Sequence, residues 1–96
     1  MTKAQVIAEI SKKTGIEKLT VNETVETFMS VIKNSMIDGN NIYLRGFGSF
    51  IVKKRAEKTG RNITKNTTLI IPSHFIPAFK PAKPFVERVK NGNKQK

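Results

Sequence analysis

The chain has 96 residues, enough for one small domain and too few for two ordinary hydrophobic cores. It has no cysteine and a single histidine, which excludes disulfides, thiolate metal sites and a structural zinc site. Since chains of this size are marginally stable alone, oligomerisation or partner binding is the remaining source of stability. A formal net charge of +11 indicates a polyanionic partner, of which nucleic acid is the first candidate.

The N-terminal segment predicts a short helix. Thr2 and Gln5 have the spacing of a capping box, in which each side chain bonds the other residue's backbone N–H. Val6, Ile7 and Ile10 follow at helical spacing, and Gly15 is a suitable residue to end the helix.

A second, longer helix is predicted to start between Glu17 and Thr20, with Thr20 and Glu23 as a possible capping box. The turn at residues 38–41 ends it. Its apolar stripe has a period of 3.6 residues and consists of Val21, Val25, Phe28, Met29, Ile32 and Met36. Together the two helices form a hairpin with a wide apolar face.

The hydrophobic period then changes from that of a helix to that of strands. Residues 41–45 and 49–55 are β-branched and aromatic runs joined at Gly46-Phe47-Gly48, which predicts a hairpin with Phe47 in the core. A third run starts at residue 67, continues to Phe79, and is interrupted by prolines, as in an edge strand. Pro84 suits the first turn of a short helix to about Lys90, and residues 91–96 are expected to be a basic disordered tail.

The charge is concentrated in the second half of the chain. Residues 1–40 carry five basic and five acidic side chains, whereas residues 41–96 carry thirteen basic and two acidic ones. Residues 56–68 contain Ile63 as their only bulky apolar side chain, so this segment cannot form a core of its own. Since strands flank it on both sides, we expect a two-stranded ribbon, an arm over about residues 55–72. Its cations are Lys53, Lys54, Arg55, Lys58, Arg61 and Lys65.

Three motifs resemble one family. They are Arg45-Gly46-Phe47-Gly48-Ser49-Phe50, then residues 55–62, and then Ile76-Pro77-Ala78-Phe79-Lys80-Pro81. Together they resemble the HU and integration host factor family of bacterial DNA-bending proteins over residues 1 to about 90. The whole first motif, and Phe79-Lys80-Pro81 at the end of the third, are more similar to the site-specific integration host factor branch than to HU.

The resemblance implies an α+β fold: a helical hairpin base, a three-stranded antiparallel sheet with a protruding β-ribbon arm, and a short C-terminal helix. It implies an intertwined dimer, either a homodimer or a heterodimer with a paralogue. Two arms would follow the minor groove of double-stranded DNA and kink it with an apolar residue at each tip. The implied DNA contacts are Lys3, Arg45, Lys53, Lys54, Arg55, Lys58, Arg61, Asn62, Ile63, Lys65, Lys80 and Lys83.

The arm tip departs from the family pattern. The family usually has Arg-Asn-Pro there, with the proline as the intercalating wedge, whereas this chain has Arg61-Asn62-Ile63. Isoleucine is one of the apolar residues used as wedges, although it lacks the fixed φ of proline. Asn66 stands where a turn glycine is usual and tolerates the same backbone geometry.

The sequence favours an architectural DNA-binding protein that bends or compacts DNA over two other functions, an RNA or single-strand binder and an enzyme. A general RNA or single-strand binder would need exposed aromatic platforms, and the phenylalanines fall in periodic apolar runs. An enzyme would need a nucleophile with its base, a carboxylate cluster or a metal set, so we expect no catalysis, cofactor or metal. His74 is expected to be an ordinary sheet-surface residue. Without an apolar leader or spanning segment, the chain is expected in the cytoplasm, on the nucleoid and not at a membrane.

Overall fold

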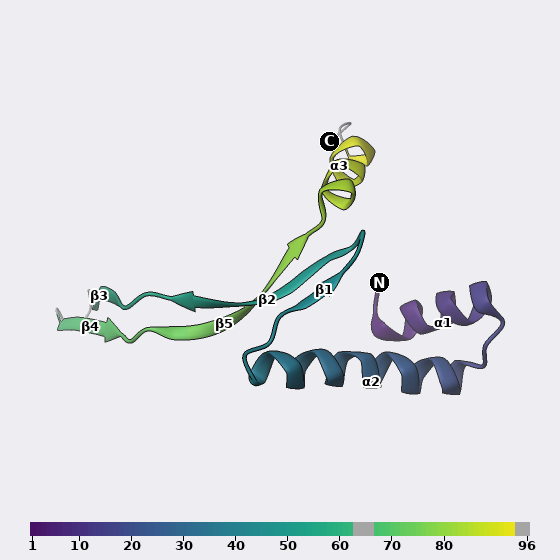
Figure 1. Ribbon diagram of the computed structural model, residues 1–96, viewed down its shortest axis with the longest axis horizontal. Helices are drawn as coiled ribbons and strands as arrows, with labels where there is room; N and C mark the ends of the chain where they lie inside the picture. The colour runs from purple at the N-terminus through teal and green to yellow at the C-terminus, as the bar shows by residue number, and fades with distance from the viewer. Residues whose placement is uncertain (63–66, 94–96) are drawn as a thin grey trace. The chain divides into compact units, whose positions relative to one another are not determined.

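The computed structural model describes residues 1–62 and 67–93. The chain divides into two compact units, residues 1–35 and 36–96. The order of elements along the chain is two helices, five strands and a third helix (Figure 1).

The first unit is helical. Helix α1 covers Lys3–Thr14, and helix α2 begins at Lys18 and runs to Ile37. The predicted capping box is present, because the Thr2 side chain accepts a hydrogen bond from the Gln5 backbone N–H and the Gln5 side chain accepts one from the Thr2 N–H. Gly15 ends α1 in the left-handed conformation with a φ of 76°, as expected of a residue without a Cβ.

The suggested second capping box, at Thr20 and Glu23, is wrong. Because α2 begins at Lys18, Thr20 already lies inside the helix, and its carbonyl accepts a hydrogen bond from the Thr24 hydroxyl. Of the predicted apolar stripe, Val21 and Ile32 are buried, whereas Phe28 keeps 48% of its surface exposed. The stripe is therefore helical as predicted and only partly covered.

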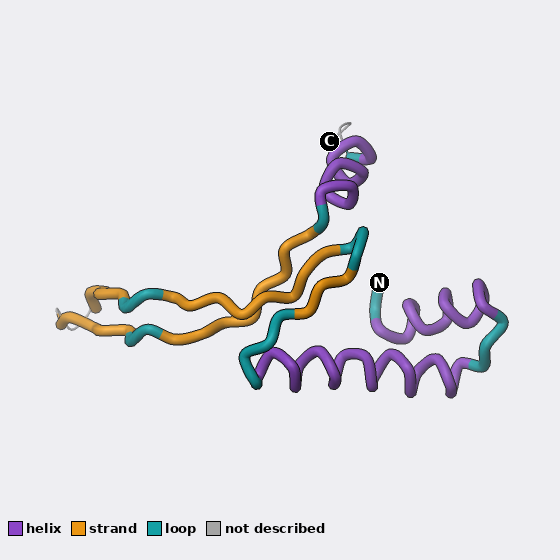
Figure 2. Tube along the Cα trace, in the orientation of Figure 1, coloured by secondary structure: helices purple, strands orange, loops and turns teal. Residues whose placement is uncertain are grey.

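The second unit contains a three-stranded antiparallel sheet in the order β1-β2-β5 (Figure 2). Strand β1 is Ile42–Leu44, β2 is Gly48–Arg55 and β5 is His74–Pro81. The first two strands form the predicted hairpin, and Gly46 has a φ of 81° in its turn. Every residue of β2 has a partner on β5 without a bulge, from Gly48 opposite Pro81 to Arg55 opposite His74.

Two further strands form a separate antiparallel ribbon. Strand β3 is Lys58–Asn62 and β4 is Thr67–Ile71, with Lys58 opposite Ile71. The sequence predicted three strands, with one long run from residue 67 to Phe79. As expected of an edge strand broken at intervals by prolines, that run is divided into β4 and β5 at residues 72–73, where Pro72 has no N–H to donate to a ladder. The predicted arm is present as the β3–β4 ribbon, and its tip at residues 63–66 lies outside the described residues.

Helix α3 covers Lys83–Gly92, with Pro84 in its first turn as predicted. It extends two residues past the expected end at Lys90, so Asn91 and Gly92 are helical and do not belong to a disordered tail. Residues 94–96, the rest of the expected tail, lie outside the described residues. Within the described ranges, no helix has the length and apolar character needed to span a membrane.

A cluster of phenylalanines links the hairpin turn, β5 and α3. The ring centroid of Phe79 lies 5.1 Å from that of Phe47 and 4.9 Å from that of Phe50. The ring of Phe85 stacks on that of Phe47 with 5.5 Å between their centroids. The backbone N–H of Ala82 donates to the Phe47 carbonyl and fixes the start of α3 to the turn. Phe47 thus packs in an apolar cluster as predicted, and the single chain leaves 46% of its surface exposed.

Candidate nucleic-acid interface

The three-stranded sheet carries most of its charged side chains on one face and its phenylalanines on the other. Side chains alternate between the two faces along a strand, and residues directly opposite each other on paired strands share a face. Ser49 therefore shares a face with its partner Lys80, and Lys53 and Arg55 follow on the same face of β2. We call this the basic face; its members are Tyr43, Ser49, Ile51, Lys53, Arg55, His74, Ile76, Ala78 and Lys80.

The opposite face is apolar and carries the phenylalanines of β2 and β5. Phe50 and Phe79 are opposite each other in the register, and their contact confirms that they share this side. Lys54 belongs to this aromatic face, with Phe75 as its partner. The register thus places the neighbouring residues Lys53 and Lys54, which the sequence grouped together, on different faces.

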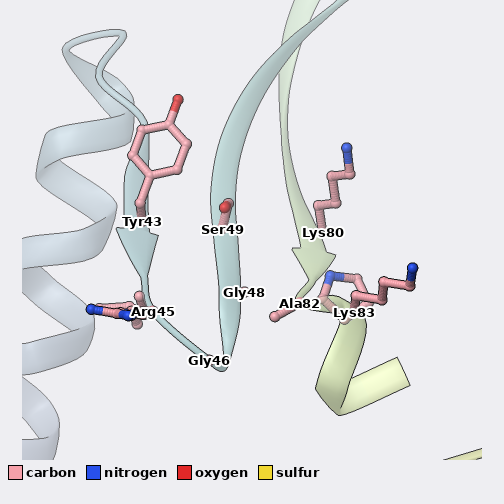
Figure 3. Close-up of a pocket in the computed structure, with 10 residues that line it drawn as sticks. Tyr43, Arg45, Gly46, Gly48, Ser49, Lys80, Ala82 and Lys83 are labelled. Carbon is pink, nitrogen blue, oxygen red and sulfur yellow. The ribbon is translucent and has the colours of Figure 1, made fainter. Parts of the chain in front are cut away.

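A pocket of about 340 Å³ lies at the hairpin-turn end of the sheet (Figure 3). Tyr43, Ser49 and Lys80 line it from three adjacent strands, and Figure 3 shows them side by side. Arg45 lines it from the hairpin turn and Lys83 from the first residue of α3. Three of the predicted DNA contacts therefore meet at one place, where cations and a helix N-terminus favour an anion.

The ribbon carries the remaining predicted contacts of the second unit. Lys58 is exposed at the base of β3, opposite Ile71, and Arg61 and Asn62 end the strand opposite Thr68 and Thr67. Ile63 and Lys65, the predicted wedge and a predicted arm cation, lie outside the described residues.

Lys3 is the one predicted contact in the helical unit. Its ammonium forms a salt bridge with the carboxylate of Glu26 on α2, with about half of each side chain exposed. The hydrogen bond from Lys3, followed by the Lys3 charge, lowers the pKa of Glu26 from its ordinary value of 4.5. To bind a phosphate, Lys3 would therefore have to give up its salt bridge with Glu26.

Three polar residues of the basic face were not among the DNA contacts predicted from the sequence. Tyr43 and Ser49 lie in one row across the sheet with Lys80, and His74 is opposite Arg55. The Asn41 side chain links β1 to β2, because its Oδ1 accepts a hydrogen bond from the Val52 N–H and its Nδ2 donates one to the Tyr43 hydroxyl. The period-two alternation of β2 was readable in the sequence, but the residues that lie opposite it required the register.

Among the described residues, no group of three His, Asp or Glu side chains is placed to hold a metal ion. The polar side chains of the candidate interface are cations, hydroxyls and one imidazole.

Comparison with known proteins identifies the family. The sequence profile of a family described as "Bacterial DNA-binding protein" matches residues 1–90. The chain belongs to this family, that of HU and integration host factor.

The most similar relatives include both branches of the family. "DNA-binding protein HU" of Thermotoga maritima is 36% identical over 90 residues, which cover 94% of this chain and 100% of the relative. "Integration host factor subunit beta" of Marinobacter nauticus is 36% identical over 96 residues, covering 99% of this chain and 98% of the relative. The likeness to both branches agrees with the resemblance inferred from the motifs.

The fold agrees as well. A chain of an Anabaena HU–DNA cocrystal structure matches with a TM-score of 0.87 and 29% identity, covering 93% of this chain and 97% of that one. The protein is therefore an architectural DNA-binding protein with the α+β fold of HU.

Proposed function

We propose that this chain works as a dimer that places double-stranded DNA across the basic faces of its two sheets and bends it with the two ribbons. The dimer would be built of two identical chains or of this chain and a paralogue. It would hold DNA mainly through phosphate contacts, organise the nucleoid and catalyse no reaction.

The observation that carries this proposal is the division of one small sheet into a basic and an aromatic face. The ribbon adds Lys58, the exposed first residue of β3. Lys53, Arg55 and Lys80 share one side of the three-stranded sheet along β2. Such a row of cations can neutralise successive phosphates without reading bases. The cocrystal of an HU with DNA supports the same use of this fold.

Dimer formation is supported by the apolar surface that this chain leaves exposed. Phe28, Phe47 and Phe79 keep 48%, 46% and 38% of their surfaces exposed. A second apolar pocket, of about 370 Å³, lies between β5 and α3 and is lined by Phe79, Pro81, Phe85, Val86 and Val89. Exposed aromatic surface of this kind, present in each of the two units, is typical of an obligate interface.

The proposed wedge at the arm tip rests on the sequence. Ile63 is apolar in a polar segment, at the position where the family has its intercalating proline. An apolar side chain between base pairs offsets the unstacking by permitting a bend, and a bent duplex contacts more of the protein.

Two other functions remain as alternatives to non-specific bending. A site-specific bender is supported by the likeness to an integration host factor subunit, and selection of bound fragments from random duplex DNA would reveal a preferred site. A general binder of RNA or single strands also needs only phosphate contacts.

Competition binding separates these functions. Labelled straight duplex, nicked duplex, single-stranded DNA and double-stranded RNA of equal length are titrated with the protein across a salt series. The proposal expects the tightest binding to nicked duplex, with the logarithm of the affinity falling linearly with the logarithm of salt, by about 0.9 for each phosphate contact. Equal or tighter binding to single strands or RNA would contradict it, and cleavage of any probe would contradict the non-catalytic role.

A further inference from the structure

His74 is the only histidine of the chain and lies on the basic face, at the start of β5. Its side chain is exposed, and in the register it lies directly opposite Arg55. Lys53 is the next cation along the same face. The imidazole is thus placed where a phosphate held by Arg55 or Lys53 would pass.

Within residues 1–62 and 67–93, the imidazole has one hydrogen bond, and this bond fixes its neutral tautomer. Nδ1 lies 3.0 Å from the backbone carbonyl oxygen of Pro72. A carbonyl oxygen only accepts, so Nδ1 carries the hydrogen and donates it. The neutral ring then presents Nε2 as a bare lone pair, which cannot bond a phosphate oxygen, whereas the protonated ring presents an Nε2–H donor.

We propose that His74 is a phosphate-binding residue whose contact forms only when its imidazole is protonated, so that DNA affinity rises as the pH falls. This inference rests on the proposed function, because it needs DNA on the basic face. It adds a residue to the binding surface and makes binding sensitive to proton concentration.

The charges around His74 determine how protonation is coupled to DNA. Arg55 and Lys53 face it from β2, and Glu57 follows in the segment between β2 and β3. A DNA phosphate placed among these cations accepts a hydrogen bond from the protonated ring and not from the bare Nε2 of the neutral ring, so DNA binding and protonation at this site favour each other.

A change of DNA affinity between about pH 7.0 and 5.5 can be assigned to His74, because histidine is the side chain that ordinarily changes charge in this range. No second histidine is present. Lys3 and Lys33 help to lower the pKa of Glu26, so its carboxylate stays ionised throughout this range and its salt bridge with Lys3 persists.

The test compares the full chain with His74→Gln and His74→Arg in duplex binding at about pH 7.0 and about pH 5.5, each over a salt series. Acidification should tighten binding of the parent about fivefold for each imidazolium–phosphate contact at roughly 0.15 M salt and steepen its salt slope by about 0.9 per chain. His74→Gln keeps a polar side chain that does not titrate, so it should bind as the parent does at the higher pH and show no pH dependence. His74→Arg should bind tightly at both pH values.

Binding of the parent that does not change with pH would overturn the inference and leave the proposed function intact. An equal pH dependence in His74→Gln would also overturn it, because another group would then be responsible. Failure of all three proteins to bind duplex at either pH would overturn the proposed function and this inference together.

Discussion

The two adjacent lysines of β2 provide the sharpest test of the sheet register. Lys53 and Lys54 have the same charge, are both exposed and are neighbours in the sequence. They differ in the face that they occupy: Lys53 shares the basic face with Arg55, whereas Lys54 lies opposite Phe75 on the aromatic face. Replacing either with glutamine removes one charge from an exposed position, and such substitutions ordinarily change folding stability by no more than about 0.5 kcal/mol.

The expected magnitude follows from counterion release. Each lost phosphate contact reduces the salt slope by about 0.9, which at roughly 0.15 M salt corresponds to about fivefold in affinity. A dimer carries the substitution twice, so Lys53→Gln should flatten the slope by about 1.8 and weaken binding about thirtyfold. Lys54→Gln should leave the slope unchanged, because its side chain lies on the face turned away from the DNA.

Fluorescence anisotropy of one labelled duplex, titrated at several salt concentrations with the parent and both variants, measures these slopes. The two variants are matched controls for each other in net charge and length. Equal losses of slope in the two variants would refute the assignment of DNA to the basic face.

Three further outcomes are expected. Because Phe28, Phe47 and Phe79 remain exposed in the single chain, the unfolding midpoint should rise with protein concentration, and a folded monomer at micromolar concentration in sedimentation would contradict the dimer. Ile63→Ala should keep most of the affinity for straight duplex and lose the preference for nicked duplex. Ile63→Pro should sharpen bending by fixing φ at about −65°. Equal rates of ring closure with the parent and with Ile63→Ala would exclude Ile63 as the wedge. The lowered pKa of Glu26 means that its salt bridge stabilises the fold at neutral pH and that this stability is lost as the pH falls below the ordinary carboxylate value of 4.5. Glu26→Gln should therefore remove that part of the acid sensitivity of folding. An unchanged acid-unfolding curve would show that the salt bridge does not contribute to stability.

Much of the fold was readable from local signals. The Thr2–Gln5 capping box, the glycine that ends α1 and the proline in the first turn of α3 each act within a few residues, so the sequence alone predicts them. The basic ribbon was also predictable, because a segment with one bulky apolar residue cannot form a core. The sequence did not show that the last strand divides at Pro72, because several spaced prolines follow residue 71 and each could interrupt the strand.

The composition of the site required tertiary information. Separation of Lys53 from Lys54 follows from alternation, but which side holds the DNA depends on where the phenylalanines cluster. The position of His74 opposite Arg55 depends on the pairing of two strands that are far apart in the chain. How much of Phe47 this chain covers by itself also required the structure, because a sequence indicates an apolar environment without showing which chain supplies it.

The central claim is that the protein bends duplex DNA, and ring closure tests it most directly. A linear duplex of roughly 100 base pairs, shorter than the persistence length of about 150 base pairs, closes very slowly under ligase when the DNA is free. We predict that substoichiometric protein accelerates closure strongly at moderate salt and that the acceleration disappears at high salt together with binding. Saturated binding of the same duplex without faster ring closure would contradict the account.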